Sequence, residues 1–211
     1  DSPERWEVFK KVYGERLGCR VDVLYLLNRQ PAPEELAEKI LSQDLIYVSG
    51  GNTLKLMNRW RHLGVDAYIR RAHHGDTVLA GQSAGMICWF AWGHSDSMSF
   101  YHPDAWSYIR VKGMGLIDAI GCPHYNSGTA GIMRRDDFHA MLRKHQEPGI
   151  AIDNHASVQF VDGGYAVTRW SRPSRALEPT SFAGSEGNWS SRSFRSTEAS
   201  PLCLTRFLRS R

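Results

Sequence analysis

The feature that most constrains the fold of this chain is an alternation of short apolar runs with amphipathic segments of helical period. Runs typical of buried strands cover residues 21–27, 44–49, 77–80, 117–121 and 149–152. Segments with helical spacing cover 5–17, 33–41, 54–63, 65–74 and 135–145, and another begins at Met86. Strands that alternate with helices build a parallel sheet covered on both faces. We therefore expect an α/β fold, a three-layer α/β/α sandwich with a mostly parallel sheet.

The last two predicted strands, 157–161 and 165–167, are separated by Gly163-Gly164, which is a hairpin turn signal. An antiparallel hairpin commonly ends such a sheet. We expect one α/β domain over residues 1–170, which opens on a helix and so lacks a first strand. Residues 171–211 contain ten Ser and seven Arg with almost no apolar period, so we expect a disordered or atypical tail.

Composition excludes several classes of protein. The net charge is +4, and the seven Arg and three Glu of residues 171–211 account for all of it, so we do not expect nucleic acid as a partner. No apolar run reaches the roughly 18 residues of a membrane span. The four cysteines are scattered, without a CxxC pair, which predicts a reducing, cytoplasmic setting and no zinc finger.

A Gly-Gln-Ser-Ala-Gly segment, residues 81–85, lies between a predicted strand and a predicted helix. This context is typical of a nucleophile elbow, in which the serine occupies a strained turn and its neighbours must be small. Backbone N–H groups at the start of the following helix would then face an oxyanion formed beside Ser83. A plain glycine-rich turn between strand and helix is the alternative interpretation.

A second glycine loop, residues 50–53, follows the strand predicted over 44–49. A glycine pair at the carboxyl end of a parallel strand lets N–H groups point into the crevice where α/β proteins bind ligands. This loop therefore predicts a second oxyanion donor. The alternative is a tight turn in which Asn52 or Thr53 is a helix N-cap. Because both loops follow strands of one predicted sheet, we expect them at the same edge.

A nucleophilic serine needs a base, and the chain has nine histidines. His124 follows the strand predicted over 117–121, which places it at the same edge as Ser83. His94 and His102 in a predicted loop, and His155 near a strand end, are alternatives. The others lie on predicted helices, where we expect them to be solvated: His62, His73, His74, His139 and His145.

A carboxylate should orient the imidazole of the base. Asp96 follows the helix that begins after Ser83, and Asp153 closes the strand over 149–152. The residues alone do not choose between these two carboxylates. A preference for acidic substrates would need a basic group in the pocket, and solvated surface charge is the alternative for each candidate: Arg110, Lys112, Arg134 and Arg135.

Residues 47–53, 81–85, 123–124 and 152–154 together resemble the S51 peptidases, the group of dipeptidase E (α-aspartyl dipeptidase) and cyanophycinase. The resemblance covers about residues 5–170 with the motifs in order. It implies a flavodoxin-like, class I glutamine amidotransferase-like fold with a terminal hairpin. Residues 171–211 have no counterpart in that resemblance.

The resemblance assigns the nucleophile to Ser83 and the base to His124, and it assigns the oxyanion donors to the backbone N–H groups of Gly51 and Ala84. For the acid it implies Asp96, or a position near 153–154 where the family has a glutamate that this chain lacks. Neighbouring positions expected to contact the substrate are Gly50, Asn52, Thr53 and Gln82.

The expected function is serine-type hydrolysis of a peptide bond in small peptides, with Asp-X dipeptides as one substrate class and β-linked peptides as another. The triad Ser83, His124 and an acid, either Asp96 or Asp153, would carry the reaction without a metal or an organic cofactor. An inactive or ligand-binding homologue on the same fold is the alternative, and a missing first strand would favour it. The sequence does not predict an oligomeric state.

Overall fold

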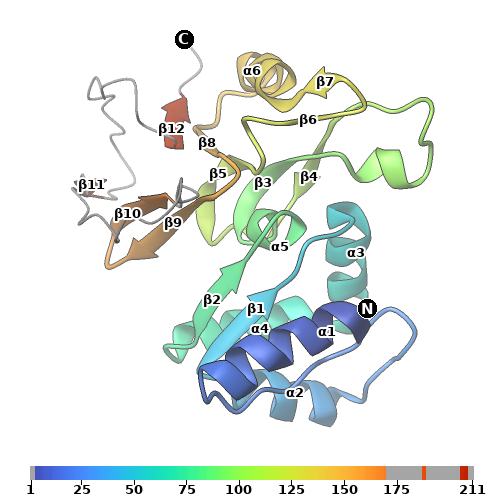
Figure 1. Cartoon of the computed structure of the whole chain (residues 1–211), viewed down its shortest axis with the longest axis vertical. Helices are drawn as coiled ribbons and strands as arrows, with labels where there is room; N and C mark the ends of the chain where they lie inside the picture. The colour runs from blue at the N-terminus through green and yellow to red at the C-terminus, as the bar shows by residue number, and fades with distance from the viewer. Residues whose placement is uncertain (1–2, 170–186, 189–204, 209–211) are drawn as a thin grey trace. The chain divides into compact units, whose positions relative to one another are not determined.

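The computed structural model describes residues 3–169, 187–188 and 205–208. Most of the predicted tail over 171–211 therefore lies outside the described residues. The chain divides into two compact units, one formed by Asp1–Ile46 with Asn58–Leu79 and one by Tyr47–Met57 with Ala80–Arg211. Figure 1 labels their elements.

The first unit is mainly helical, and its helices match the predicted ones. They are α1 (Pro3–Phe9), its π-helical continuation over Lys10–Arg16, α2 (Pro33–Leu41) and α4 (Val65–His74). Proline at the first position of α2 has the fixed φ that suits a helix start. Helices α2 and α4 pack together, and their buried apolar side chains are Leu36, Ile40, Val65, Ile69 and Ala72.

The strand predicted over 21–27 is wrong, because the structure has no strand there. These residues form an irregular, partly exposed segment whose carbonyl groups accept hydrogen bonds from helix side chains. Lys39 Nζ donates to the carbonyl of Val23 at 3.1 Å, and Arg59 Nε donates to that of Leu26 at 2.7 Å. The apolar run is real, but side-chain donors bind carbonyl groups that a sheet partner would otherwise bind.

Strands β1 (Leu45–Val48) and β2 (Val78–Gly81) form a two-stranded sheet, and both were predicted. Val78 N donates to Asp44 O, and Gln82 N donates to Val48 O four residues further along both strands, which is parallel pairing. Helix α3 (Thr53–Leu63) follows β1, and the four-residue helix α5 (Ala84–Ile87) follows β2.

A five-stranded sheet in the second unit has the order β12-β8-β5-β3-β4. Its bounds are β3 (Phe90–Ser95), β4 (Ile109–Lys112), β5 (Ile117–Cys122), β8 (Gly149–Ile152) and β12 (Thr205–Leu208). The central strands β3, β5 and β8 are parallel, whereas β4 and β12 pair antiparallel at the edges. The parallel sheet was predicted, but β3 and β4 were not, because their glycine, histidine and charged residues interrupt any apolar run.

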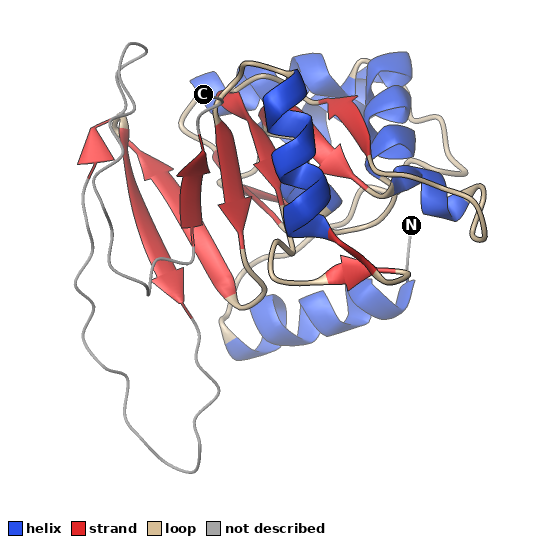
Figure 2. Ribbon diagram, turned by 90° about the horizontal axis from the view of Figure 1, so that it is seen from above, coloured by secondary structure: helices blue, strands red, loops and turns tan. Residues whose placement is uncertain are grey.

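Both faces of strands β5 and β8 are buried, which explains why they appear as continuous apolar runs in the sequence. One face packs on helix α6 (Arg134–Lys144), with the cluster Ile120, Cys122, Tyr125, Phe138, Leu142 and Ala151. The other face carries the cluster Met86, Phe90, Ala119, Ile150 and Ile152. Helical residues thus lie on both faces, which agrees with the predicted α/β/α sandwich (Figure 2).

The predicted terminal hairpin is present as β9 (Ala156–Val161) and β10 (Gly164–Arg169). Strand β10 also pairs with β11 (Gly187–Asn188), which completes a separate antiparallel sheet. The hairpin turn lies one residue earlier than expected, at Asp162-Gly163, with φ of 49° and 75°. Two positive φ values are typical of a type I′ turn. Val158 and Phe160 of the hairpin pack against the second cluster, so the hairpin covers part of that face. A second short hairpin pairs β6 (Gly128–Thr129) with β7 (Ile132–Met133).

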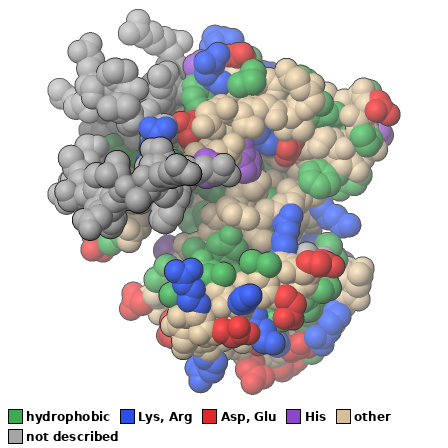
Figure 3. Space-filling model, viewed as in Figure 1, with side chains coloured by type: hydrophobic (Ala, Val, Ile, Leu, Met, Phe, Trp, Pro, Cys, Tyr) green, Lys and Arg blue, Asp and Glu red, His purple; other side chains and the backbone are tan. Residues whose placement is uncertain are grey.

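Acidic and basic side chains are interspersed on the face drawn in Figure 3, where histidine side chains also reach the surface. Within the described ranges, none of the helices combines the length and the apolar character that crossing a bilayer requires.

Candidate active site

Ser83 stands at a strained turn between β2 and α5. Its φ of 55° and ψ of −117° lie outside the regions that a non-glycine residue prefers. The flanking glycines are required by close approach: a Cβ on Gly85 would lie 1.9 Å from Val48 O, and a Cβ on Gly81 would lie 2.2 Å from Gly85 O. Ser83 itself is partly exposed. This is the geometry expected of a nucleophile elbow.

Helix α5 is a single turn, so its macrodipole is small, and the local N–H groups matter more. Ala84 is its first residue, and an N–H at this position has no acceptor within a helix. Gly50 lies against the serine, because a Cβ added to Gly50 would be 3.0 Å from Ser83 Cβ. Gly51, next to it, is exposed. The two expected oxyanion donors therefore belong to segments that flank Ser83.

The second half of the glycine loop caps helix α3. Asn52 Oδ1 accepts from the N–H of Lys55 at 2.9 Å, which is N-cap geometry. Its Nδ2 donates to Ser97 O at 3.2 Å, and Ser97 Oγ accepts from Leu54 N at 3.0 Å. Thr53 is only 1% exposed, so its expected contact with substrate is wrong: burial keeps that side chain from a ligand. Gln82 is exposed beside Ser83.

Helix α5 packs closely on strands β3 and β5. A Cβ on Gly93 of β3 would lie 2.0 Å from Ile87 Cγ2, and one on Gly121 of β5 would lie 2.9 Å from Met86 Cε. The two glycines pair with each other across β3 and β5. Ser83 lies three residues before Met86, and His124 lies three residues after Gly121. Ser83 and His124 are thus both close in sequence to the contact between Met86 and Gly121.

His124 follows β5 and is partly exposed, with a positive φ of 53°. Its Nδ1 lies 2.6 Å from Asn154 Oδ1. An amide oxygen can only accept, so Nδ1 carries the proton and Nε2 keeps its lone pair. The described structure has no hydrogen bond between Ser83 and His124. Catalytic hydrogen bonds are often long until substrate binds.

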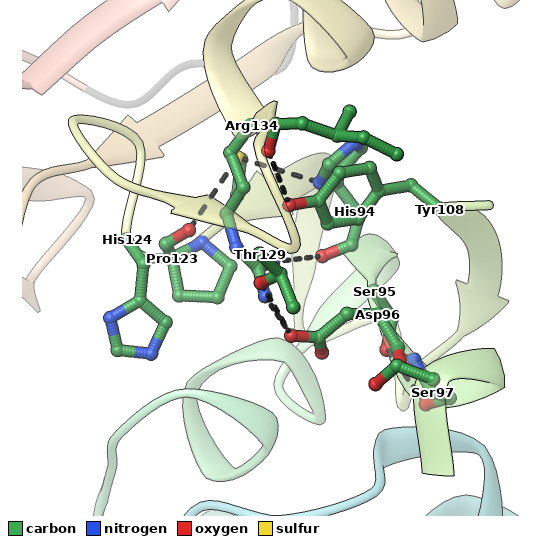
Figure 4. Close-up of polar contacts among 12 residues, drawn as sticks. His94, Ser95, Asp96, Ser97, Tyr108, Pro123, His124, Thr129 and Arg134 are labelled. Atoms are coloured by element: carbon green, nitrogen blue, oxygen red, sulfur yellow. Dashed lines mark hydrogen bonds and ion pairs between the residues drawn. The ribbon is translucent and has the colours of Figure 1, made fainter. Parts of the chain in front are cut away.

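Neither predicted acid is the partner of His124. The carboxylate of Asp96 forms an ion pair with Arg134 and accepts from Thr129 Oγ1 at 3.4 Å. Figure 4 shows this pair apart from the imidazole of His124. Arg134 is 3% exposed, and a buried cation requires a paired anion, so Arg134 retains Asp96. Asp153 directly precedes Asn154, and it is the asparagine that bonds the ring.

Sequence reasoning missed Asn154 because it looked for a carboxylate. The signal that could have identified this residue is the pairing of the strands over 117–121 and 149–152. These are adjacent in the sheet, with Cys122 opposite Ala151, so the residues after each strand meet. The polar residue two positions after β8 is Asn154.

His94, expected in a loop, lies in β3 and is fully buried. Its Nε2 lies 2.8 Å from Asp137 Oδ1, and its ring stacks on Tyr108 with 4.2 Å between centroids. Burial lowers the pKa of His94 to about 4, although the hydrogen bond with Asp137 opposes this shift. Burial also disfavours the charged form of Cys122, and this raises the pKa of its thiol. The Sγ of Cys122 lies 3.8 Å from His94 Nδ1. A ring with no exposed surface cannot serve as a base for a bound substrate.

Arg110 and Arg135, two of the other basic candidates for a substrate carboxylate, also have acidic partners. Arg110 pairs with Glu147 and stacks on Trp92, with 3.7 Å from Cζ to the ring centroid. Arg135 is exposed and pairs with Asp136 at 3.1 Å. Lys112 lies 6.0 Å from the ring centroid of Trp92.

The chain resembles curated peptidases over most of its described length. It is 34% identical to the uncharacterized peptidase YgaJ of Bacillus subtilis (strain 168) over 134 residues, 63% of this chain and 54% of that protein. It is 24% identical to the uncharacterized peptidase Lmo0363 of Listeria monocytogenes over 160 residues, 74% of this chain and 73% of that protein. The chain thus spans about half the length of the Bacillus relative.

Two crystal structures share the fold. One, of a protein assigned to peptidase E from Listeria monocytogenes EGD-e, has a TM-score of 0.61 and 23% identity, covering 81% of this chain and 80% of that one. The other, a peptidase from an acI-B1 Actinobacterium, has a TM-score of 0.64 and 21% identity, covering 81% and 70%. The model of Peptidase family S51 matches residues 1–168. With a serine at a strand–helix elbow and a family match across residues 1–168, this chain belongs to peptidase family S51.

Proposed function

We propose that this chain is a serine-type peptidase that hydrolyses a peptide bond in small peptides, with Ser83 as nucleophile and His124 as base. The observation that carries the proposal is the strained, partly exposed Ser83 at the strand–helix turn, packed against Gly50. The hydrogen bond from His124 Nδ1 to Asn154 supports it, because it leaves Nε2 free to take the serine proton.

In the proposed reaction, Ser83 Oγ attacks the scissile carbonyl carbon while its proton passes to His124 Nε2. The N–H groups of Gly51 and Ala84 stabilise the resulting oxyanion, and each such donor typically lowers the barrier by about 3 kcal/mol. The proton on Nε2 then passes to the leaving amine as the C–N bond breaks. Water hydrolyses the acyl-enzyme, with His124 accepting its proton and returning it to Ser83 Oγ.

Asp-X dipeptides are the substrate class that the family resemblance suggests, and Gly50, Asn52 and Gln82 are the proposed neighbours of the bound peptide. Arg134 is a candidate for recognising an acidic side chain, but Asp96 already balances its charge. We therefore include neutral dipeptides in the proposal. Cys88 and Cys122 are buried free thiols, which suits the cytoplasmic, reducing setting that we propose.

The test is a fluorophosphonate probe together with a panel of Asp-X and Ala-X dipeptides, applied to the full chain and to Ser83→Ala. We expect the full chain to be labelled once, and Ser83→Ala to lose both labelling and at least about 10³-fold in kcat/KM. Ser107→Ala is the matched control, since Ser107 is an exposed loop serine. Labelling that survives in Ser83→Ala would overturn the nucleophile. Absence of hydrolysis across the panel would favour the ligand-binding alternative.

A further inference from the structure

Two asparagines link the loops that follow β5 and β8. Asn154 Oδ1 lies 2.6 Å from His124 Nδ1, and the backbone N–H of Asn154 donates to Asn126 Oδ1 at 2.9 Å. The N–H of Tyr125 donates to Ile152 O at 3.1 Å. Three hydrogen bonds thus join residues 124–126 to residues 152–154. Because β5 and β8 are adjacent parallel strands, this linkage continues their pairing beyond the sheet.

From this geometry we infer that Asn154 is the positioning residue for His124, that Asn126 holds Asn154 in place, and that an uncharged amide acts where a carboxylate was expected. The inference rests on the proposed peptidase function. Asn154 acts through His124 and does not itself touch the reacting atoms. An asparagine behind a catalytic histidine also occurs in papain-like Cys-His-Asn sites.

The amide has a definite chemical consequence. Its oxygen selects the tautomer with a proton on Nδ1, as a carboxylate would, so that Nε2 can act as a base. It carries no negative charge, however, and so stabilises the imidazolium that forms when His124 takes the serine proton less than a carboxylate would. An aspartate at position 154 would supply that stabilisation and favour the protonated ring.

The charged groups around this segment do not replace the missing carboxylate. Asp96 is bonded to Arg134 and Thr129, on the far side of Pro123 from the imidazole in Figure 4. Asp153 and His155 flank Asn154 in the chain. In the described structure the imidazole of His124 has one hydrogen-bond partner, the side chain of Asn154.

The test uses Asn154→Ala, Asn154→Asp and Asn126→Ala in the full chain. The matched control is Asn58→Asp, which adds the same charge at an exposed position of α3. The substrate is a dipeptide that the unmodified chain hydrolyses, and kcat and KM are measured from pH 5 to 9. Asn154 and Asn126 are exposed, so we expect thermal midpoints to change little.

We expect Asn154→Ala to lower kcat about 10²-fold while KM changes less, and Asn126→Ala to lower it about tenfold. We expect Asn154→Asp to move the acid limb of the kcat/KM profile upward by about one pH unit, and Asn58→Asp to leave it in place. A twofold or smaller change in Asn154→Ala, or an unmoved limb in Asn154→Asp, would overturn the positioning role.

A second measurement separates this inference from the proposed function. Histidine ring-proton NMR titrations of the unmodified chain and Asn154→Asp follow His124 directly, with its signal identified by its loss in His124→Gln. We expect the His124 midpoint to move upward by about one pH unit in Asn154→Asp, whether or not any peptide is hydrolysed. An unmoved midpoint would overturn the contact between residues 154 and 124. Activity retained by Ser83→Ala would instead overturn the proposed function.

Discussion

Two histidines of the second unit have opposite surroundings. His94 is completely buried, bonds the carboxylate of Asp137 and stacks on Tyr108. His124 is partly exposed, and its imidazole bonds the neutral side-chain amide of Asn154. Judged by its partner alone, His94 has the histidine–carboxylate pair of a catalytic triad. Judged by access, only His124 can meet a substrate.

The difference shows that a histidine–carboxylate pair is not by itself evidence of a catalytic site. In the buried cluster, defined here as His94, Asp96, Arg134 and Asp137, each charged group has a partner that offsets the cost of its burial. Ser83 and His124 instead combine a positive φ with partial exposure. Strain and exposure are typical of functional residues.

The largest expected effect separates the two histidines by function. We expect His124→Ala to lower kcat/KM at least about 10³-fold, because the serine loses its base, while the thermal midpoint hardly changes. His94→Ala should behave oppositely, with a loss of about 3 kcal/mol in the free energy of unfolding, because it leaves a cavity and an unpaired Asp137. Dipeptide kinetics and urea unfolding of both variants check this. Full activity in His124→Ala would contradict the assignment of His124 as the base.

A smaller effect separates two neighbouring arginines. Arg134→Met should lower the free energy of unfolding by about 3 kcal/mol, because Asp96 loses the buried cation that pairs with it. Arg135→Met is its control, since Arg135 and Asp136 form an exposed ion pair, and it should change stability by less than about 0.5 kcal/mol. Urea unfolding at pH 7 measures both. Equal losses in the two variants would mean that the cluster does not stabilise the fold.

The last expected effect, spread over several pH units, is a dependence of stability on pH. Burial lowers the pKa of His94 to about 4 in the folded chain, against about 6.5 when unfolded. Between these values only the unfolded chain binds the proton, so stability falls as pH falls through this window, by up to about 1.4 kcal/mol per pH unit. His94→Gln cannot take that proton, and its stability curve should lack this slope. Parallel curves for the two proteins would contradict the burial of His94.

Local pattern was enough to predict most elements, and it failed where the pattern was misleading. Helices α2 and α4 were predicted to the residue, because proline, glycine and apolar spacing mark their ends. Strand β3 was missed, because Gly93, His94 and Ser95 have polar or absent side chains even though all three are buried. The false strand over 21–27 is apolar, but partner strands are a property of the fold and cannot be deduced from one segment.

The site was predictable to a similar extent. Ser83 and its glycines were identified from the sequence, because steric demands at the turn permit few residues. The partner of His124 was not, since a search for charge selected Asp96 and Asp153 ahead of the amide at position 154. That contact depends on the register of β5 and β8, which is set by long-range pairing.

The absence of side chains at Gly93 and Gly121 has a consequence for how this protein can vary. Side chains fill the space above both glycines: an added Cβ would lie 2.0 Å from Ile87 Cγ2 at Gly93, and 2.8 Å from Phe90 Cδ2 at Gly121. A single added methyl group at either position would force these side chains to shift. Natural or engineered diversity should therefore accumulate in the surrounding loops, and these two interior positions should tolerate almost none.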